Sequence, residues 1–280
     1  MIFSEPIPFA EAIASREFKA ILPTDLSSAQ LSAIAPELRE RAIFSARTNN
    51  HEYLVRVNEV LNRILNPDQV IDEVTGALRA ARPGEFMDQA TARLELKKTL
   101  IQTDYVPDPA VRGTIRDLSS DARLNLLIET NDRMALGYGQ WTQGQDPAIL
   151  DEWPAQELFR AEDRELPRNW IARWTGAGGT IFEGRMIAPK NDPIWTLISA
   201  FGLPYPPFDF NSGMDVQDID RDEAVRLGVV SEDTQIEPET REFNDGIEAS
   251  VDERQPALFQ ALMDSLGDTA EFVGGVLTLK

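Results

Sequence analysis

The chain has 280 residues, of which 42% are hydrophobic, a composition typical of a folded protein with one large or two modest domains. It contains no cysteine and one histidine, which excludes disulfides, cysteine nucleophiles and two-histidine metal sites. No apolar run is long enough for a membrane-spanning helix, and the first residues lack the basic segment of a secretory signal.

The formal net charge of −20 is concentrated near one end of the chain. Residues 1–107 hold 15 acidic and 12 basic side chains, and residues 108–208 hold 14 and 10. Residues 209–280 hold 18 acidic and 5 basic side chains. Because an acidic surface repels phosphate, this balance argues against direct DNA binding by the chain as a whole.

Residues 1–107 are expected to form a helical N-terminal region. The strongest helical pattern covers 50–65, where apolar residues recur on one face with Asn49 or Asn50 as the cap and Pro67 as the stop. These apolar residues are Leu54, Val57, Leu61 and Ile64. The other helices predicted in this region cover 8–21, 36–47, 68–82 and 86–101.

Residues 108–230 are expected to form a small mixed core that is rich in loops. Another helix is predicted from Ser119 or Ser120 to Tyr138, and a short one from Asp220 to Leu227 with Gly228 after its end. Strands are predicted at 158–163 and 180–188, whereas 203–213 holds too many prolines for a helix or a central strand.

Residues 231–280 are expected to form an acidic tail. Residues 231–255 hold 9 acidic and 2 basic side chains and are predicted to be a linker or extended segment. A last amphipathic helix follows at 256–266, and 272–280 is predicted to be a hairpin or strand. The fold class that emerges is α+β and mostly helical.

Seven aromatic residues gather in a stretch rich in proline and glycine. They are Trp170, Trp174, Trp195, Phe201, Tyr205, Phe208 and Phe210. Such a stretch lacks regular hydrogen-bond ladders, and aromatic rings can supply buried area without them. Core packing is the favoured interpretation, and a docking surface is the alternative, because Trp, Tyr and Arg are common at interface hot spots.

The predicted last helix offers a second candidate interaction site. Its apolar positions are Leu258, Leu262, Met263 and Leu266. Beyond an acidic linker, such a helix can pack in a groove of a neighbouring protein or on its own core, and the sequence does not decide between these.

No motif in the sequence predicts a catalytic residue, a cofactor or a metal site. His51 has no second histidine or cysteine, Ser212 lacks the glycines of a nucleophile elbow, and the glycine-rich 175–180 lacks the lysine of a phosphate loop. The acidic residues of 209–223 provide the one alternative, a divalent-metal-dependent hydrolase or nuclease that uses their oxygens. They are Asp209, Asp215, Asp218, Asp220, Asp222 and Glu223.

A family resemblance runs through the middle of the chain. The residues that carry it are Thr130, Asn131, Ala135 and Gly139 on the predicted helix, Leu158–Arg160, Asp163, Arg168, Trp170, Gly178–Gly179, Pro193–Trp195 and Pro204–Asn211. In this order they resemble the phage head morphogenesis proteins, the minor head proteins of the Mu F type. The resemblance covers about residues 20–230, as a divergent prophage-like branch.

The resemblance implies a non-enzymatic minor structural protein of a tailed-phage or prophage-derived head. It implies a place in the virion near the portal vertex, host cytoplasm during assembly, and contacts with the portal protein, the major capsid protein or further copies of itself, without a membrane. A capsid-lining protein without portal contact is a further alternative.

The chain departs from the family at two places. The family's histidine is absent, with Trp170 or Ala172 near its position, and the family's closing Cys-Arg-Cys is replaced by Asn211-Ser212-Gly213. Any role that depends on those histidine and cysteine side chains therefore does not carry over to this chain.

Overall fold

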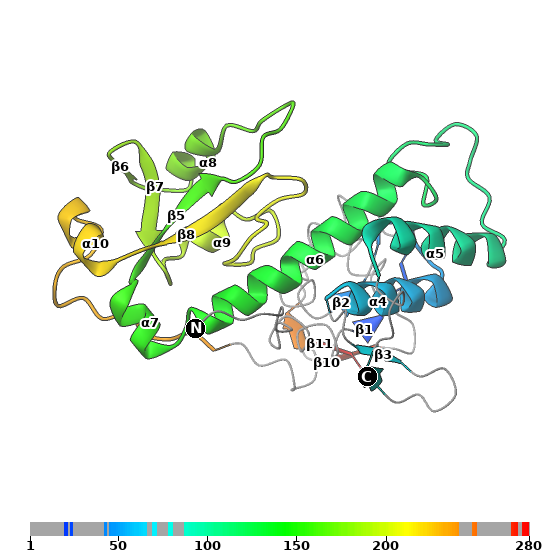
Figure 1. Cartoon of the computed structure of the whole chain (residues 1–280), viewed down its shortest axis with the longest axis horizontal. Coiled ribbons are helices and arrows are strands. Elements are labelled where there is room, and N and C mark those ends of the chain that lie inside the picture. Colours follow the sequence, from blue (N-terminus) through cyan, green and yellow to red (C-terminus); the bar gives the residue numbers. More distant parts are fainter. Residues whose placement is uncertain are drawn as a thin grey trace. The chain divides into compact units, whose positions relative to one another are not determined.

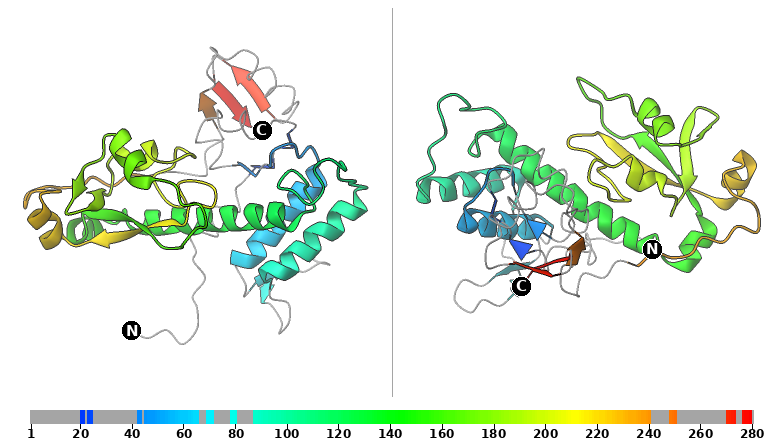
Figure 2. Two further views of the ribbon diagram at one scale, coloured as in Figure 1. Left: turned by 90° about the horizontal axis from the view of Figure 1, so that it is seen from above. Right: turned by 180° about the vertical axis from the view of Figure 1, so that it is seen from behind.

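The computed structural model describes residues 20–21, 23–24, 42–43, 45–65, 69–71, 78–80, 87–240, 248–250, 270–273 and 276–279. The fold is mixed α+β and mostly helical, as the sequence predicts (Figures 1 and 2). The chain divides into two compact units, which we call unit 1 (Met1–Ala135 with Phe243–Lys280) and unit 2 (Leu136–Glu242). These boundaries differ from those expected after residues 107 and 230.

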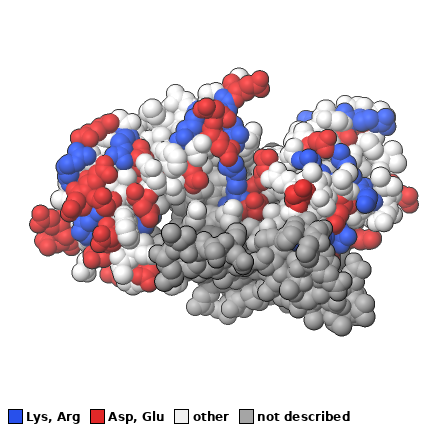
Figure 3. Space-filling view, in the orientation of Figure 1, with Lys and Arg blue, Asp and Glu red and all other residues white. Residues whose placement is uncertain are grey.

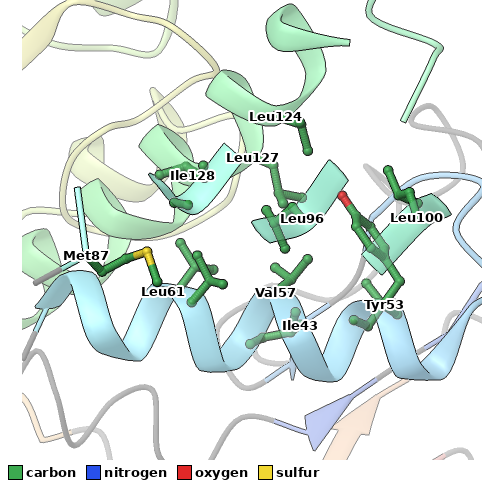
Figure 4. Close-up of a cluster of buried hydrophobic side chains, with 13 residues drawn as sticks. Ile43, Tyr53, Val57, Leu61, Met87, Leu96, Leu100, Leu124, Leu127 and Ile128 are labelled. Carbon is green, nitrogen blue, oxygen red and sulfur yellow. The ribbon is translucent and has the colours of Figure 1, made fainter. Parts of the chain in front are cut away.

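The core of unit 1 is built by three helices, α4 (His51–Leu65), α5 (Gln89–Gln102) and the first part of α6 (Asp121–Gln143). Figure 2 shows α4 and α5 side by side, and Figure 4 shows the apolar side chains between the helices. The predicted face of α4 is confirmed, because Leu54, Val57 and Leu61 are fully buried. Asn50 caps the helix by accepting a hydrogen bond from the Tyr53 N–H at 2.9 Å.

The loop between α5 and α6 is organised by the buried side chain of Asp117. One carboxylate oxygen accepts hydrogen bonds from the N–H and hydroxyl of Ser119, and the other accepts the Gly113 N–H at 2.8 Å. Burial raises the pKa of Asp117, but these hydrogen bonds outweigh it and hold the pKa below its ordinary value. Ser120 then begins α6, accepting the Arg123 N–H at 3.1 Å.

The short strands of unit 1 are β1 (Ala20–Ile21), β2 (Ala42–Ile43), β3 (Gln69–Ile71), β4 (Leu78–Ala80), β9 (Glu248–Ser250), β10 (Ala270–Val273) and β11 (Val276–Leu279). The predictions are wrong at β1 to β4, which stand where helices are expected. Parallel pairing of β1 with β2 overrides helix propensity at the end of 8–21 and in the middle of 36–47. Antiparallel pairing of β3 with β4 does the same in 68–82, where Val70 and Ile71 are β-branched.

The hairpin predicted at 272–280 is confirmed by the antiparallel pairing of β10 with β11. The helix predicted at 256–266, with Leu258, Leu262, Met263 and Leu266, lies outside the described residues. Among the helices of the described residues, none combines the length and the apolar character that a membrane span requires.

Unit 2 is a four-stranded antiparallel sheet with helices on both sides. It contains the end of α6, α7 (Pro147–Glu152), β5 (Ala155–Arg160), α8 (Trp170–Gly176), β6 (Ile181–Phe182), β7 (Arg185–Pro189), α9 (Ile194–Leu197), β8 (Met214–Ile219) and α10 (Arg221–Leu227). The strand order is β6-β7-β5-β8. Figure 1 shows α8 and α9 on one side of the sheet and α10 on the other, in agreement with two separate apolar clusters.

The sequence predicts α10 and, with shifted boundaries, the strands β5, β6 and β7, but it does not predict α7, α8, α9 or β8. The strand expected at 158–163 begins earlier, at Ala155, and ends at Arg160. The strand expected at 180–188 is divided into β6 and β7 by a turn in which Glu183 and Gly184 have positive φ angles. Helix α10 is as predicted, since Asp220 caps it through the Glu223 N–H at 2.8 Å and Gly228 ends it in the left-handed conformation.

Helix α6 continues beyond Tyr138, where the sequence predicts its end. A Cβ atom on Gly137 would lie 2.3 Å from the carbonyl oxygen of Pro206. The glycine that weakens the helix locally is therefore the residue that lets α6 approach the proline-rich loop, and tertiary packing outweighs its low helix propensity.

Candidate interaction site

Three of the seven aromatic residues form the centre of unit 2. Trp174, Trp195 and Phe208 are fully buried, with ring centroids 5.3 Å apart for the two tryptophans and 6.0 Å apart for Trp195 and Phe208. Each indole N–H donates to a main-chain carbonyl at 2.8 Å, Trp174 to Thr180 and Trp195 to Pro189. The rings thus connect α8, α9 and the loop before β8 without a long secondary-structure element.

Three more of the predicted aromatic residues are also buried, namely Trp170, Phe201 and Tyr205. Tyr205 contacts the rings of Tyr138 and Trp141 on α6, at centroid distances of 5.9 and 6.1 Å. The seventh residue, Phe210, is 47% exposed and packs one edge on Phe201 at 4.8 Å. The expectation of a buried core is therefore wrong for Phe210, whose loop turns it toward solvent.

Three large apolar side chains are exposed in the segments 166–171 and 209–210. We call Leu166, Ile171 and Phe210 the exposed apolar surface; their exposed fractions are 91%, 56% and 47%. Arg168 ties the segments together, because it donates to the Phe210 carbonyl at 3.0 Å and lies 3.4 Å from the Asp209 carboxylate. Exposed apolar side chains at arginine-rich positions are typical of protein interfaces.

The six acidic residues of 209–223 do not converge on one point. Asp209 forms an ion pair with Arg173 at 2.9 Å, Asp218 with Lys190 at 3.0 Å, and Glu223 with Arg185 at 2.6 Å. Asp215 accepts the N–H of Val216, Asp220 caps α10, and Asp222 lies in the first turn of that helix.

A metal ion would need several of these oxygens close together. In the described residues, which include all of 209–223, no three His, Cys, Asp or Glu side chains are placed to hold a metal ion. The convergence that the hydrolase or nuclease alternative requires is therefore not found in this part of the chain.

A pocket of about 360 Å³ lies within unit 2, between the end of α6, the sheet and the proline-rich loop. Its lining includes Gln140, Trp141, Gln145, Gln156, Lys190, Tyr205, Val216 and Asp218. Lys190 is only 4% exposed and its charge is balanced by Asp218, whose side chain remains 49% exposed. The volume is within the range of natural ligand pockets.

An extended segment of the chain is bound at the edge of this pocket. The side chains of Gln145 and Asn191 bond each other in both directions, at 3.0 and 2.9 Å. Asn191 also donates to the Glu237 carbonyl at 2.7 Å, and Gln145 accepts the Glu239 N–H at 2.8 Å. Two side-chain amides therefore bind the main chain of 237–239.

The pocket is not predicted from the sequence. Its polar residues come from α6, β5, the end of β7 and β8, so they are far apart in the chain and form no motif. Comparisons with models of protein families, with curated proteins and with solved structures return no match.

Proposed function

We propose that this chain is a minor structural protein of a tailed-phage or prophage-derived head, and that it acts in head morphogenesis through contacts with the portal protein, the major capsid protein or both. The observation that carries the proposal is the structural role of the residues on which the family resemblance rests. Among them, Leu158, Trp170 and Trp195 are buried and pack in the core of unit 2, whereas Asp163, Arg168 and Asn211 are exposed.

The tryptophan of the Pro-Ile-Trp step illustrates this role. Trp195 is fully buried, and the step begins α9, where the Asp192 carboxylate accepts the Ile194 N–H at 2.8 Å. The small-residue turn is equally constrained, because a Cβ atom on Gly179 would lie 2.3 Å from the Trp174 indole nitrogen. Such positions are explained by packing alone.

At both places where the chain departs from the family, the residues that are present have a structural role. Trp170, near the position of the missing histidine, is buried under the guanidinium of Arg173 at 4.8 Å. Ser212, within the segment that replaces Cys-Arg-Cys, is buried, donates to the Pro207 carbonyl and accepts the Met214 N–H. These contacts hold the local fold without histidine or cysteine chemistry.

The exposed apolar surface is the part of unit 2 that we assign to protein contacts. A partner can cover Leu166, Ile171 and Phe210 without disturbing the packing inside unit 2. Each apolar side chain of this size that becomes fully buried contributes about 1.5–3 kcal/mol of favourable free energy. The ion pairs of Asp209 with Arg168 and Arg173 hold the two segments in place before the partner arrives.

The test is capture of the tagged full-length chain from an induced or infected lysate, with mass spectrometry for the portal and major capsid proteins. We expect one or both to be recovered, and the double variant L166D/F210D to reduce their recovery. L94D/I101D, which places the same two charges at a 60%-exposed leucine and a 73%-exposed isoleucine of α5, is the matched control.

Recovery of neither head protein would contradict the proposal. The number of copies in purified particles separates the two structural alternatives, because a portal-associated protein is present in few copies and a capsid-lining protein in many. Equal losses in L166D/F210D and L94D/I101D would contradict the assignment of the contact surface.

A further inference from the structure

The rim of the pocket in unit 2 carries acidic side chains. The segments 136–157, 201–220 and 229–240 hold 12 acidic residues, of which Asp151, Glu157 and Asp209 are already ion-paired with arginines. Glu237 and Glu239, in the segment bound at the rim, are exposed. Lys190 is the one basic residue of the lining, and it is buried against Asp218. Figure 3 shows acidic and basic side chains mixed on the face of unit 2 in view. The exposed carboxylates of the rim favour a cationic ligand.

The side-chain amide of Gln156 lines the pocket. The residue is 7% exposed and has no side-chain hydrogen bond with any residue that the structure describes. It lies on β5 directly opposite Asp218 of β8. Its amide reaches the open space of the pocket, where it can both donate to and accept from a group that enters.

Strand β8 is at the end of the sheet, with one edge unpaired in the strand order. The Gly213 carbonyl accepts N–H groups of Ala161 and Glu162, so at odd-numbered positions the main chain faces β5. At even-numbered positions it faces away, as the bonds from the Met214 N–H to Ser212 and from the Val216 N–H to Asp215 show.

Val216 and Asp218 are therefore the residues whose main-chain groups point outward, and both line the pocket. The N–H of Val216 is already bonded by Asp215, whereas its carbonyl and the main-chain groups of Asp218 remain at the open edge. An extended chain can add to such an edge by main-chain hydrogen bonds.

The rim shows the same kind of recognition within the chain itself. Gln145, which lines the pocket, and Asn191 bind the main chain of 237–239, whose acidic side chains are exposed. The pocket thus offers amides for a main chain, aromatic rings of Trp141 and Tyr205 for an apolar side chain, and acidic groups around them.

We infer that this pocket is a docking site for an extended, basic peptide segment of a partner protein, which pairs with the outer edge of β8 and bonds Gln156. The inference rests on the proposed function in that it names the kind of partner segment that an assembly protein of this kind would take.

The probe is a short, capped, fluorescently labelled peptide in which lysine alternates with threonine and valine, and the protein is the purified full-length chain. Fluorescence anisotropy measures the affinity. We expect binding that weakens as salt is added, because exposed charges are screened. A second peptide carries N-methyl groups on alternate amides, which removes N–H donors and keeps the charge. It should bind at least about tenfold more weakly, since main-chain hydrogen bonds are lost.

Two sets of variants test the site itself. Gln156→Leu should weaken binding of the unmodified peptide at least about tenfold, with a thermal melt to confirm folding. The double variant E237Q/E239Q removes two exposed rim charges and should weaken it about fivefold. Its control is D163N/E165Q, which removes two exposed charges from the loop after β5 and should leave the affinity unchanged.

Equal affinity for the two peptides would overturn the inference, and so would equal effects of the rim and control double variants. Self-association of the chain that Gln156→Leu abolishes would overturn it in favour of a second copy as the occupant. Peptide binding by the purified chain without recovery of head proteins from the lysate would leave this site standing and remove the proposed function.

Discussion

Replacing Trp195 with alanine is expected to destabilise unit 2 more than any other single aromatic truncation. The side chain is fully buried between Trp174 and Phe208, at the point where α8, α9 and the loop before β8 meet. Removing it leaves a cavity in contact with all three segments, none of which can fill the space without moving the others.

The expected loss is dominated by packing. Truncation of a buried aromatic side chain costs about 3–5 kcal/mol. The lost indole hydrogen bond adds only about 1 kcal/mol, because the Pro189 carbonyl keeps a second donor, the Asp192 N–H at 3.1 Å. For a unit of this size, the melting temperature should fall by about 16–24 °C. Trp195→Phe, which keeps a ring, should lose well under half of that.

Tryptophan fluorescence is a selective assay, because all five tryptophans lie in residues 136–242 and therefore report on unit 2. The control is Trp153→Ala at a 40%-exposed tryptophan, where we expect a change of about 0.5 kcal/mol or less. If Trp195→Ala melted within a few degrees of Trp153→Ala, the aromatic cluster would not be the core of unit 2.

Two further predictions use other positions. Gly137→Ala should lower the stability of unit 2 by about 1–3 kcal/mol, because its Cβ would lie 2.3 Å from the Pro206 carbonyl oxygen. Gly176→Ala is the control and should be neutral, because the space around that position is open. Similar fluorescence melts of the two variants would refute this prediction. The depressed pKa of Asp117 means that its ionised form stabilises the fold. The wild type should therefore be more stable than Asp117→Asn above about pH 4, and the difference should shrink as the pH falls below that value; parallel pH profiles in circular dichroism melts would contradict it.

Local patterns predict the helices that carry their own start and stop signals. Helix α4 has a regular apolar face and an asparagine cap, and α10 has Asp220 at one end and Gly228 at the other. The predictions fail at 42–43, 69–71 and 78–80, where pairing with a distant or neighbouring strand decides the conformation. Propensity within a short window does not contain that pairing energy.

The aromatic stretch and the pocket also differ in how far the sequence predicts them. The aromatic stretch is visible in the sequence because its residues are close together, although the exposure of Phe210 depends on how one loop turns. The pocket depends on Gln156, Lys190 and Asp218, which β-sheet register and α6 bring together from separate segments. In the sequence alone, nothing marks any of these three polar residues as part of a pocket.

The mutual amide pair of Gln145 and Asn191 has a consequence for how the chain responds to its medium. Neither side chain titrates, and neither carries a net charge that salt could screen. The attachment of 237–239 should therefore persist from mildly acidic to alkaline solution and at high ionic strength, while the carboxylates around it change their interactions. Changes in pH or salt that alter the charges of the acidic segment 237–239 should therefore leave its attachment to unit 2 intact.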